Sequence, residues 1–152
     1  MCFNNSMTKT ALEVAARYRR KYWREADPTI FEKYNVSGFA NPDFPIITND
    51  EYIQIKKWGL IPRFIKTNQE AKKVRNMTLN ARAETIFKLP SFRNNITSHR
   101  CIVPSTGFFE PHVNPDKTRT PYFVRLKNEG IFSLAGIYDS WTDKETGEEL
   151  HT

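Results

Sequence analysis

The chain has 152 residues, of which 39% are hydrophobic and 13% aromatic, and this length lets one domain bury roughly 70% of its unfolded surface. No apolar run approaches the ~20 residues that span a bilayer, and the first twenty residues contain no apolar signal region, which excludes membrane-spanning and secreted classes and predicts a soluble protein. The net charge of +6 favours polyanionic partners such as nucleic acid over acidic proteins.

The cysteine and histidine content limits the compartment and the cofactors. The two cysteines, Cys2 and Cys101, suit a reducing compartment and argue against a disulfide framework. Together with three histidines at scattered spacings, they match no zinc-ligand pattern. We therefore expect a cytoplasmic protein, associated with the nucleoid if it is bacterial, that holds no metal and no other cofactor.

The first predicted element is a helix that begins at a cap on Ser6 or Thr8 and runs to about Glu25. The sequence "DPT" at 27–29 ends it. One face is apolar, and the outer face carries a basic series that fits either a solvated surface or a nucleic-acid contact: Arg17, Arg19, Arg20, Lys21 and Arg24.

Strand patterns dominate the rest of the chain, at 44–48, 51–58, 100–105, 107–111, 121–127 and 131–141. Asn49-Asp50 is predicted to join the first two strands as a hairpin, and residues 128–130 to join the last two. A short helix is predicted at 81–88, and "LHT" at 150–152 resembles the start of a returning strand. Several short strands with few helices predict a β-rich α+β fold, with antiparallel sheets that form a partly closed barrel.

Cys2 is the first candidate site residue, because it follows the initiator methionine and a small second side chain favours removal of Met1. A free N-terminal cysteine combines an α-amine of pKa about 7.7–8.0 with a thiol of pKa about 8.5. The amine can condense with an aldehyde to an imine, and the thiolate can then close a stable thiazolidine ring. Acyl transfer with the α-amine as base is an alternative, and an incidental second residue is another.

The segment "WGLIPRF" at 58–64 sets apolar side chains beside an arginine. Trp58, Pro62 and Phe64 next to Arg63 are the residue types that stack on or separate bases in single-stranded nucleic acid. A hydrophobic loop folded onto the core is an equally good interpretation of these residues.

Two later motifs offer polar groups. In "NARAET" at 80–85, Asn80 can orient a polar substrate and Arg82 can hold a phosphate, unless Arg82 simply pairs with Glu84. In "STGFFEP" at 105–111, Glu110 lies in an apolar run, where desolvation favours the protonated carboxyl group and suits a general acid or base. An exposed glutamate on an edge strand is the alternative.

These segments resemble one family when they are taken in order. "MC" at the start, "YNV" at 34–36, "WGLIP", "NARAET", "RCIVPSTGFFEP" and "FSLAGIYDSW" are similar to the SRAP (SOS response-associated peptidase) family over essentially the whole chain. The resemblance implies recognition of abasic sites in single-stranded DNA, and covalent capture of the ring-opened sugar aldehyde by the N-terminal cysteine as a thiazolidine. It also implies that the protein removes its own Met1.

The same resemblance implies a role for each matching residue. Cys2 would be the crosslinking nucleophile, Asn80 would position the sugar, and Glu110 would transfer protons in this lyase-like chemistry. The residues that contact DNA would be Arg82, Trp58, Pro62, Arg63, Phe64 and Asn35. A monomer without a membrane contact is expected.

The chain departs from the family pattern at two places. Most family members begin "MCGR", whose arginine contacts phosphate, whereas Phe3 and Asn4 stand here. The family also continues into an "H-x-R-M-P" segment that these residues do not contain, so we expect residues 1–152 to be one domain that lacks its C-terminal portion. A thiol-dependent peptidase and a non-catalytic single-stranded DNA-binding module, whose binding would survive Cys2→Ser, remain the alternatives.

Overall fold

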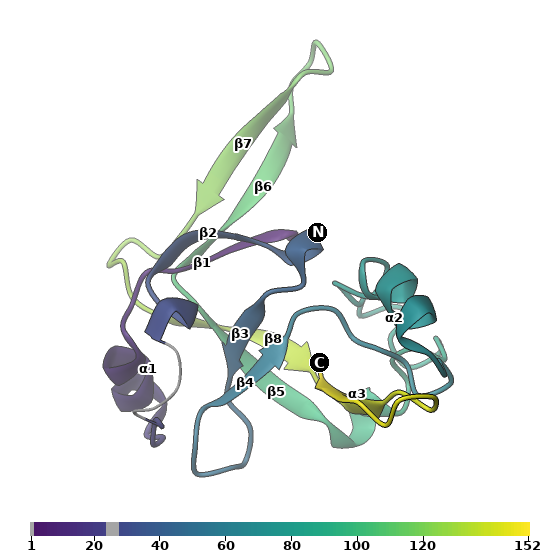
Figure 1. Cartoon of the computed structure of the whole chain (residues 1–152). Coiled ribbons are helices and arrows are strands. Elements are labelled where there is room, and N and C mark those ends of the chain that lie inside the picture. Colours follow the sequence, from purple (N-terminus) through teal and green to yellow (C-terminus); the bar gives the residue numbers. More distant parts are fainter. Residues whose placement is uncertain (1, 24–27) are drawn as a thin grey trace.

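Short antiparallel strands with few helices between them make up the computed structural model, which describes residues 2–23 and 28–152 (Figure 1). The strands are β1 (Asn4–Met7), β2 (Lys33–Ser37), β3 (Asp43–Ile46), β4 (Gln54–Lys57), β5 (Arg100–Ser105), β6 (Gly107–Val113), β7 (Arg119–Val124), β8 (Phe132–Ile137), β9 (Ser140–Thr142) and β10 (Glu149–His151). The helices are α1 (Ala11–Tyr18), α2 (Asn68–Arg75) and α3 (Asn95–Ser98), with 3-10 turns η1 (Pro28–Ile30) and η2 (Gly38–Ala40). The predicted α+β class is confirmed.

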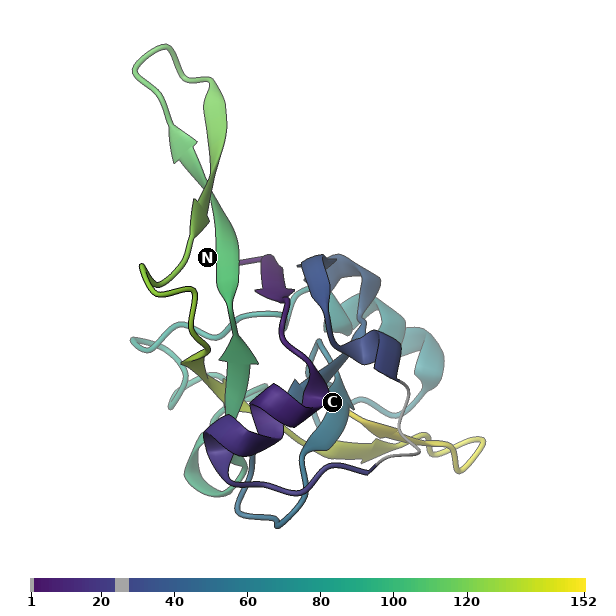
Figure 2. The ribbon, with the colours of Figure 1, turned by 90° about the vertical axis from the view of Figure 1, so that its left-hand side faces the viewer.

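The strands form one larger sheet and several pairs. The larger sheet has the order β2-β1-β6-β7, and the pairs are β3-β4, β5-β8 and β9-β10. β6 and β7 extend beyond β1 and β2 as a hairpin that projects from the rest of the molecule in both views (Figures 1 and 2). The bend at Thr106 carries the chain from β5 into β6, and so links the β5-β8 pair to the larger sheet.

The first helix is shorter than predicted at both ends. Ser6 lies in β1, and the helix begins instead at Thr10, whose side chain and Glu13 form a reciprocal capping box. It ends where Arg19 takes a left-handed conformation with φ 52°. Lys21 then bridges to Tyr52, so Arg17, Arg19, Arg20 and Lys21 do not form one helix face. Residues 24–27, which include Arg24 and Asp27, lie outside the described residues.

Both predicted hairpins differ from the structure. β3 and β4 pair as expected, but their connection spans residues 47–53, because the backbone of Ile47 bonds to Ile102 instead of continuing the pair. The second hairpin prediction is wrong: β7 pairs with β6, and β8 pairs with β5. The predicted strand 131–141 is split, because Tyr138 and Asp139 bond to His99 and Thr152 rather than along one ladder.

The predicted helix at 81–88 is also wrong. These residues form consecutive turns with isolated helical hydrogen bonds, such as Ile86 N–H to Arg82 O. Most of their side chains are exposed, so no apolar stripe anchors a regular helix. α2 and α3 were not predicted, although the Thr67–Glu70 capping box before α2 is visible in the sequence. The strand predicted from "LHT" is confirmed as part of β10.

The core divides into two clusters of buried side chains. The larger one joins β1, α1 and β3 through Met7, Val14, Phe31, Val36, Phe44, Ile47 and Ile53. The smaller one joins the 58–65 segment to α2 and β9 through Ile61, Ile65, Ala71 and Trp141. Within the described ranges, no helix has the length and apolar character needed to cross a membrane.

Candidate active site around Cys2

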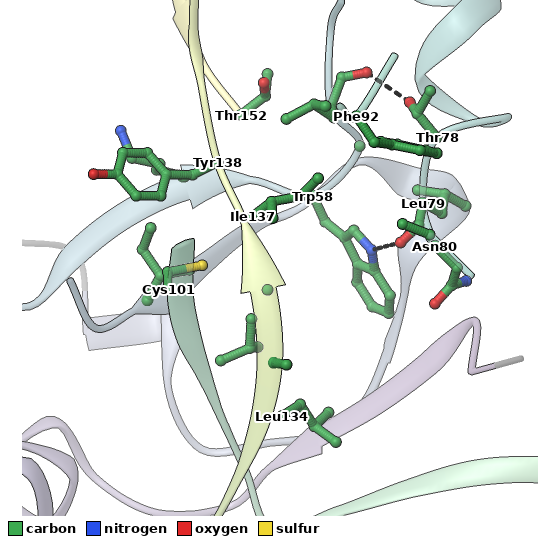
Figure 3. Close-up of a pocket in the computed structure, with 18 of the residues that line it drawn as sticks. Trp58, Thr78, Leu79, Asn80, Phe92, Cys101, Leu134, Ile137, Tyr138 and Thr152 are labelled. Carbon is green, nitrogen blue, oxygen red and sulfur yellow. Dashed lines mark hydrogen bonds between the residues drawn. The ribbon is translucent and has the colours of Figure 1, made fainter. Parts of the chain in front are cut away.

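A cavity of about 470 Å³ lies beside Cys2. Figure 3 shows its wall, to which β8 contributes Leu134 and Ile137, β5 contributes Cys101, and the segment before the 81–90 turns contributes Leu79 and Asn80. Most of these side chains are apolar, so polar groups at the edge of the cavity act in a partly desolvated setting.

The strand that follows Cys2 is fixed by buried polar contacts. Ser105 donates a hydrogen bond of 2.6 Å to the side-chain oxygen of Asn5, and Thr106 contacts both Ser6 and Thr8. Asn5, Ser6 and Ser105 are almost completely buried. Because buried polar groups of this kind are costly to leave unpaired, these bonds define the register of β1 against the Ser105–Gly107 bend.

The main chain at Cys2 is held from two further sides. The side-chain amide of Asn80 donates a hydrogen bond of 2.8 Å to the Cys2 carbonyl, and the Gly38 N–H donates one of 2.8 Å to the Phe3 carbonyl. The structure therefore brings the predicted pair Cys2 and Asn80 into direct contact.

The Cys2 thiol is half-buried, and its hydrogen bond goes to the Asn4 carbonyl at 3.1 Å. Burial raises the pKa of this thiol above its ordinary value, and the negative charge of Glu110 raises it further. In the free protein the thiol therefore keeps its proton at neutral pH.

Glu110 lies on β6, one residue beyond the Asn4–Phe109 pair of the β1-β6 ladder. Its other neighbour in the sheet is Tyr122 on β7. The carboxylate is half-buried and close enough to act on the charge of the Cys2 thiol. Sequence reasoning could place Glu110 on a strand, but only the β1-β6 pairing brings it to the level of Phe3, the residue next to Cys2.

Trp58 contacts two of the segments that hold the residues around Cys2. Its indole N–H donates a hydrogen bond of 2.9 Å to the carbonyl of Leu79, the residue before Asn80 (Figure 3). Its ring lies so close to Gly38 that a Cβ atom there would be 3.1 Å from it. Trp58 therefore couples the segment that carries Asn80 to the turn that binds Phe3.

The rest of the 58–64 segment divides between core and surface. Pro62 is buried, together with Leu60 and Ile61 before it. Arg63 forms two hydrogen bonds of 3.0 Å with the buried carboxylate of Asp139. Phe64 is 58% exposed, so among these neighbours it is the large apolar side chain that is accessible to a ligand.

The remaining predicted residues lie on the surface. Arg82 is exposed two residues after Asn80, and within the described part of the chain it forms no ion pair with Glu84. Asn35 is exposed on β2, the strand next to β1. The structure therefore groups Cys2, Asn80, Glu110 and Trp58, while Arg63 faces Asp139.

Sequence reasoning missed two polar groups of the same cavity. Burial raises the pKa of Cys101 to about 11. Burial also lowers the pKa of Lys56, whose ammonium lies 5.1 Å from the centre of the Tyr138 ring. Cys101 stands in the "RCIVPSTGFFEP" segment, but nothing in that segment or around Lys56 marks either side chain as part of a cavity. Among residues 2–23 and 28–152, no cluster of three or more His, Cys, Asp or Glu side chains could hold a metal.

Cys2, whose carbonyl is held by Asn80 and whose thiol is affected by the charge of Glu110, defines a candidate thiol site at the second position of the chain. The family model for SOS response associated peptidase (SRAP) matches residues 1–152, and the chain belongs to this family.

Curated relatives of the chain carry names that refer to abasic sites. The "abasic site processing protein YoqW" of Bacillus subtilis is 40% identical over 139 residues, which cover 81% of this chain and 60% of that protein. The Saccharomyces cerevisiae protein YMR114C, also named as an abasic site processing protein, is 33% identical over 69% of this chain and 26% of its own length. The chain thus spans at most three-fifths of the length of these relatives.

Solved structures show the same fold. A protein from Bacteroides thetaiotaomicron superimposes with a TM-score of 0.93 at 50% identity, and covers 99% of this chain and 66% of the other. A protein from Bordetella bronchiseptica has a TM-score of 0.79 at 19% identity and covers 99% of this chain and 69% of the other, which is a likeness of fold alone.

Proposed function

We propose that this protein recognises abasic sites in single-stranded DNA and joins Cys2 to the ring-opened deoxyribose as a thiazolidine, once Met1 has been removed. The observation that carries the proposal is the Asn80–Cys2 hydrogen bond, which holds the first residue of the processed chain at the cavity edge beside Glu110. Family membership and the printed names of the curated relatives support the same substrate.

The chemistry proceeds in two steps. The α-amine of Cys2 adds to the C1′ aldehyde of the open sugar, and loss of one water gives an imine. The Cys2 sulfur then adds to the imine carbon, and the thiol proton passes to the nitrogen, so the ring closes with no other co-reactant. Because burial keeps the thiol protonated, this second step needs a nearby group that accepts and returns a proton.

Glu110 is our candidate for that proton transfer, since its carboxylate acts on the Cys2 thiol. Asn80 positions the main chain of Cys2 with one N–H of its side-chain amide. The second N–H and the amide oxygen would bind the hydroxyl groups of the sugar. The same site would remove Met1, which is the peptidase reaction of the family name: the Cys2 thiol attacks the Met1 carbonyl carbon, the peptide C–N bond breaks and frees the α-amine of Cys2, and water hydrolyses the thioester to release methionine.

The DNA strand would lie across the exposed side chains around the cavity. Arg82 would bind a backbone phosphate, Phe64 would contact a base, and Asn35 would bind polar groups on the β2 side. Trp58 is hydrogen-bonded to Leu79, Pro62 is buried, and Arg63 is ion-paired with Asp139. We therefore propose that these three residues set the shape of the 58–64 segment and do not bind DNA directly. We infer action as a monomer in the cytoplasm, at the nucleoid in a bacterial cell.

A denaturing gel tests the proposal. The chain is mixed with a single-stranded oligonucleotide that carries one abasic aldehyde, and a retarded band that survives denaturation is expected. Cys2→Ser should remove this band, as should prior borohydride reduction of the sugar to its alcohol. A band of equal intensity with the reduced oligonucleotide would contradict aldehyde capture.

A further inference from the structure

An aromatic pair lies directly beside Cys2. The rings of Phe3 and Phe39 are stacked with centroids 5.0 Å apart and an interplanar angle of 29°. Phe39 is nevertheless 52% exposed, so much of its apolar surface remains in contact with water. Neither ring belongs to the two buried core clusters. The pair therefore presents aromatic surface at the edge of the site rather than filling the interior.

The turn that carries Phe39 is anchored to the site. Phe39 lies in η2, and the N–H of Gly38 in the same turn bonds to the Phe3 carbonyl. Asn41 closes the turn with φ 47°, and its side-chain amide donates to the Trp58 carbonyl at 3.0 Å. These contacts hold the Phe39 ring in a fixed place beside the N-terminal residues, which reduces the entropy lost when it binds a ligand.

Phe3 and Phe39 are also coupled to the residues that hold Cys2. The ring of Trp58 packs on Gly38, and its N–H bonds to the carbonyl that precedes Asn80. Asn80 in turn bonds to Cys2. The aromatic pair and the nucleophile are thus parts of one continuous set of contacts.

The distances fit the neighbouring nucleotide of a captured strand. Consecutive Cα atoms lie about 3.8 Å apart, and stacked nucleotides in one DNA strand are spaced by about 3.4 Å. Phe3 follows Cys2 in the chain and its carbonyl is bonded to the turn that carries Phe39, so a base attached next to a sugar at Cys2 would lie near this aromatic pair. An abasic nucleotide leaves that base without a stacking partner on one side, and this free face can pack on an aromatic ring.

We propose that Phe3 and Phe39 form a stacking platform for the nucleobase that flanks the abasic nucleotide. This inference rests on the proposed function, because the abasic sugar defines which base is meant. The platform accepts a base of any identity, since every base offers an aromatic face.

Equilibrium binding to oligonucleotides with a tetrahydrofuran abasic analogue tests the platform. The analogue has no aldehyde, so it reports binding without a crosslink. The flanking nucleotide on each side is replaced in turn by a second tetrahydrofuran, and fluorescence anisotropy gives the dissociation constants. For the natural chain, loss of the flanking base on one side should weaken binding about tenfold, as expected for one base–aromatic stack.

Substitutions of Phe39 test whether the aromatic pair causes this dependence on the flanking base. Phe39→Ala and Phe39→Leu should bind the parent oligonucleotide about tenfold more weakly and no longer distinguish the oligonucleotide that lacks the flanking base. The leucine retains apolar bulk for folding, which thermal unfolding checks. Trp23→Ala is the matched control: Trp23 is 57% exposed and stacks on Tyr52, outside the contacts that join Phe3 and Phe39 to the residues around Cys2. It should discriminate as the natural chain does.

Two results would overturn the platform. One is a natural chain that binds equally well with and without either flanking base, and the other is a Phe39→Leu variant that keeps the full discrimination. Base-dependent binding without a crosslink to the aldehyde would support the platform and contradict covalent capture. Absence of binding to every oligonucleotide would overturn both proposals.

Discussion

Asn80 and Cys2 are separated by 78 positions in the sequence, yet the side-chain amide of Asn80 donates a 2.8 Å hydrogen bond to the Cys2 carbonyl. The bond fixes a residue that would otherwise belong to a free chain end, since chain termini are poorly ordered unless they are tied down. We therefore expect Asn80 to act mainly by positioning Cys2.

We predict that Asn80→Ala slows crosslinking about tenfold, because a nucleophile that moves freely is rarely in reacting geometry. The free energy of unfolding should fall by only about 1 kcal/mol, the usual net value of one hydrogen bond. Single-turnover crosslinking and thermal unfolding measure the two effects. Asn114→Ala is the control, because the Asn114 side-chain amide donates to Thr118 and Thr120 at the hairpin tip, away from Cys2. An Asn80→Ala variant with the natural rate would contradict the positioning role.

Arg63 and Asp139 lead to a prediction on stability. Asp139 is only 2% exposed, and Arg63 binds both of its carboxylate oxygens. Arg63→Ala should reduce the free energy of unfolding by about 2 kcal/mol, less than for a fully buried pair because Arg63 itself is largely exposed. Arg119→Ala on exposed β7 should change it little. Denaturant titration compares the variants, and equal stability of Arg63→Ala and the natural chain would show that the pair is not stabilising.

The same pair predicts a dependence on pH. Burial alone would raise the pKa of Asp139, but hydrogen bonds from Arg63, Asn95 and the Ser140 N–H outweigh it and keep the pKa below its ordinary value. A lowered carboxyl pKa stabilises the fold fully above about pH 4 and loses this effect as the pH falls further. The stability difference between Arg63→Ala and the natural chain should therefore shrink below about pH 4. A constant difference from pH 7 to pH 2 would contradict this assignment.

Cys101 should be an unreactive neighbour of Cys2. Burial raises its pKa to about 11, so at pH 8 about one thiol in a thousand is ionised. In Cys2→Ser, labelling by iodoacetamide followed by mass spectrometry should be slow at pH 8 and rise about tenfold per pH unit toward pH 11. Cys101→Ala should crosslink as the natural chain does. Labelling of Cys101 at the rate of free cysteine would contradict the effect of burial.

Gly59 and Gly147 both have positive φ, and comparing them distinguishes the cost of backbone strain from the cost of steric contact. Gly59 has φ 114°, and a Cβ there would lie 2.8 Å from the Asn41 amide and 3.0 Å from the Arg75 carbonyl. Gly147 has φ 75° with no atom within 4 Å of such a Cβ. Gly59→Ala should therefore cost about 3 kcal/mol, and Gly147→Ala about 1 kcal/mol. Thermal unfolding measures both, and equal costs would show that the contacts around Gly59 add nothing.

Local patterns in the sequence predicted the positions of the strands better than they predicted which strands pair. The runs around Val103 and Phe108 are strands as expected, because alternation and β-branched or aromatic residues mark them. The pairing of β7 with β6 and of β8 with β5 depends on contacts between distant segments, which turn residues such as Gly130 do not reveal. The first helix was misjudged because Lys21 and Tyr22 continue its pattern, while the backbone leaves the helix at Arg19 to reach Glu51 and Tyr52.

The site was only partly visible in the sequence. Its residue types stood in motifs, so Cys2, Asn80 and Glu110 could be named. Their proximity could not be deduced, because it depends on β1 lying beside β6 and on Trp58 holding the carbonyl before Asn80. Phe39 was overlooked because an isolated aromatic residue in a Gly- and Pro-containing segment has no distinctive pattern, and only its stacking on Phe3 marks it.

Capture of an abasic aldehyde by Cys2 is tested most directly by intact mass. The purified chain is weighed before and after incubation with a single-stranded oligonucleotide that carries one abasic site, with Cys2→Ser in parallel. We predict a chain without Met1 and then an adduct at the combined mass less one water, which the variant does not form. A chain that lacks Met1 and gives no adduct, or an equal adduct with Cys2→Ser, would contradict the account.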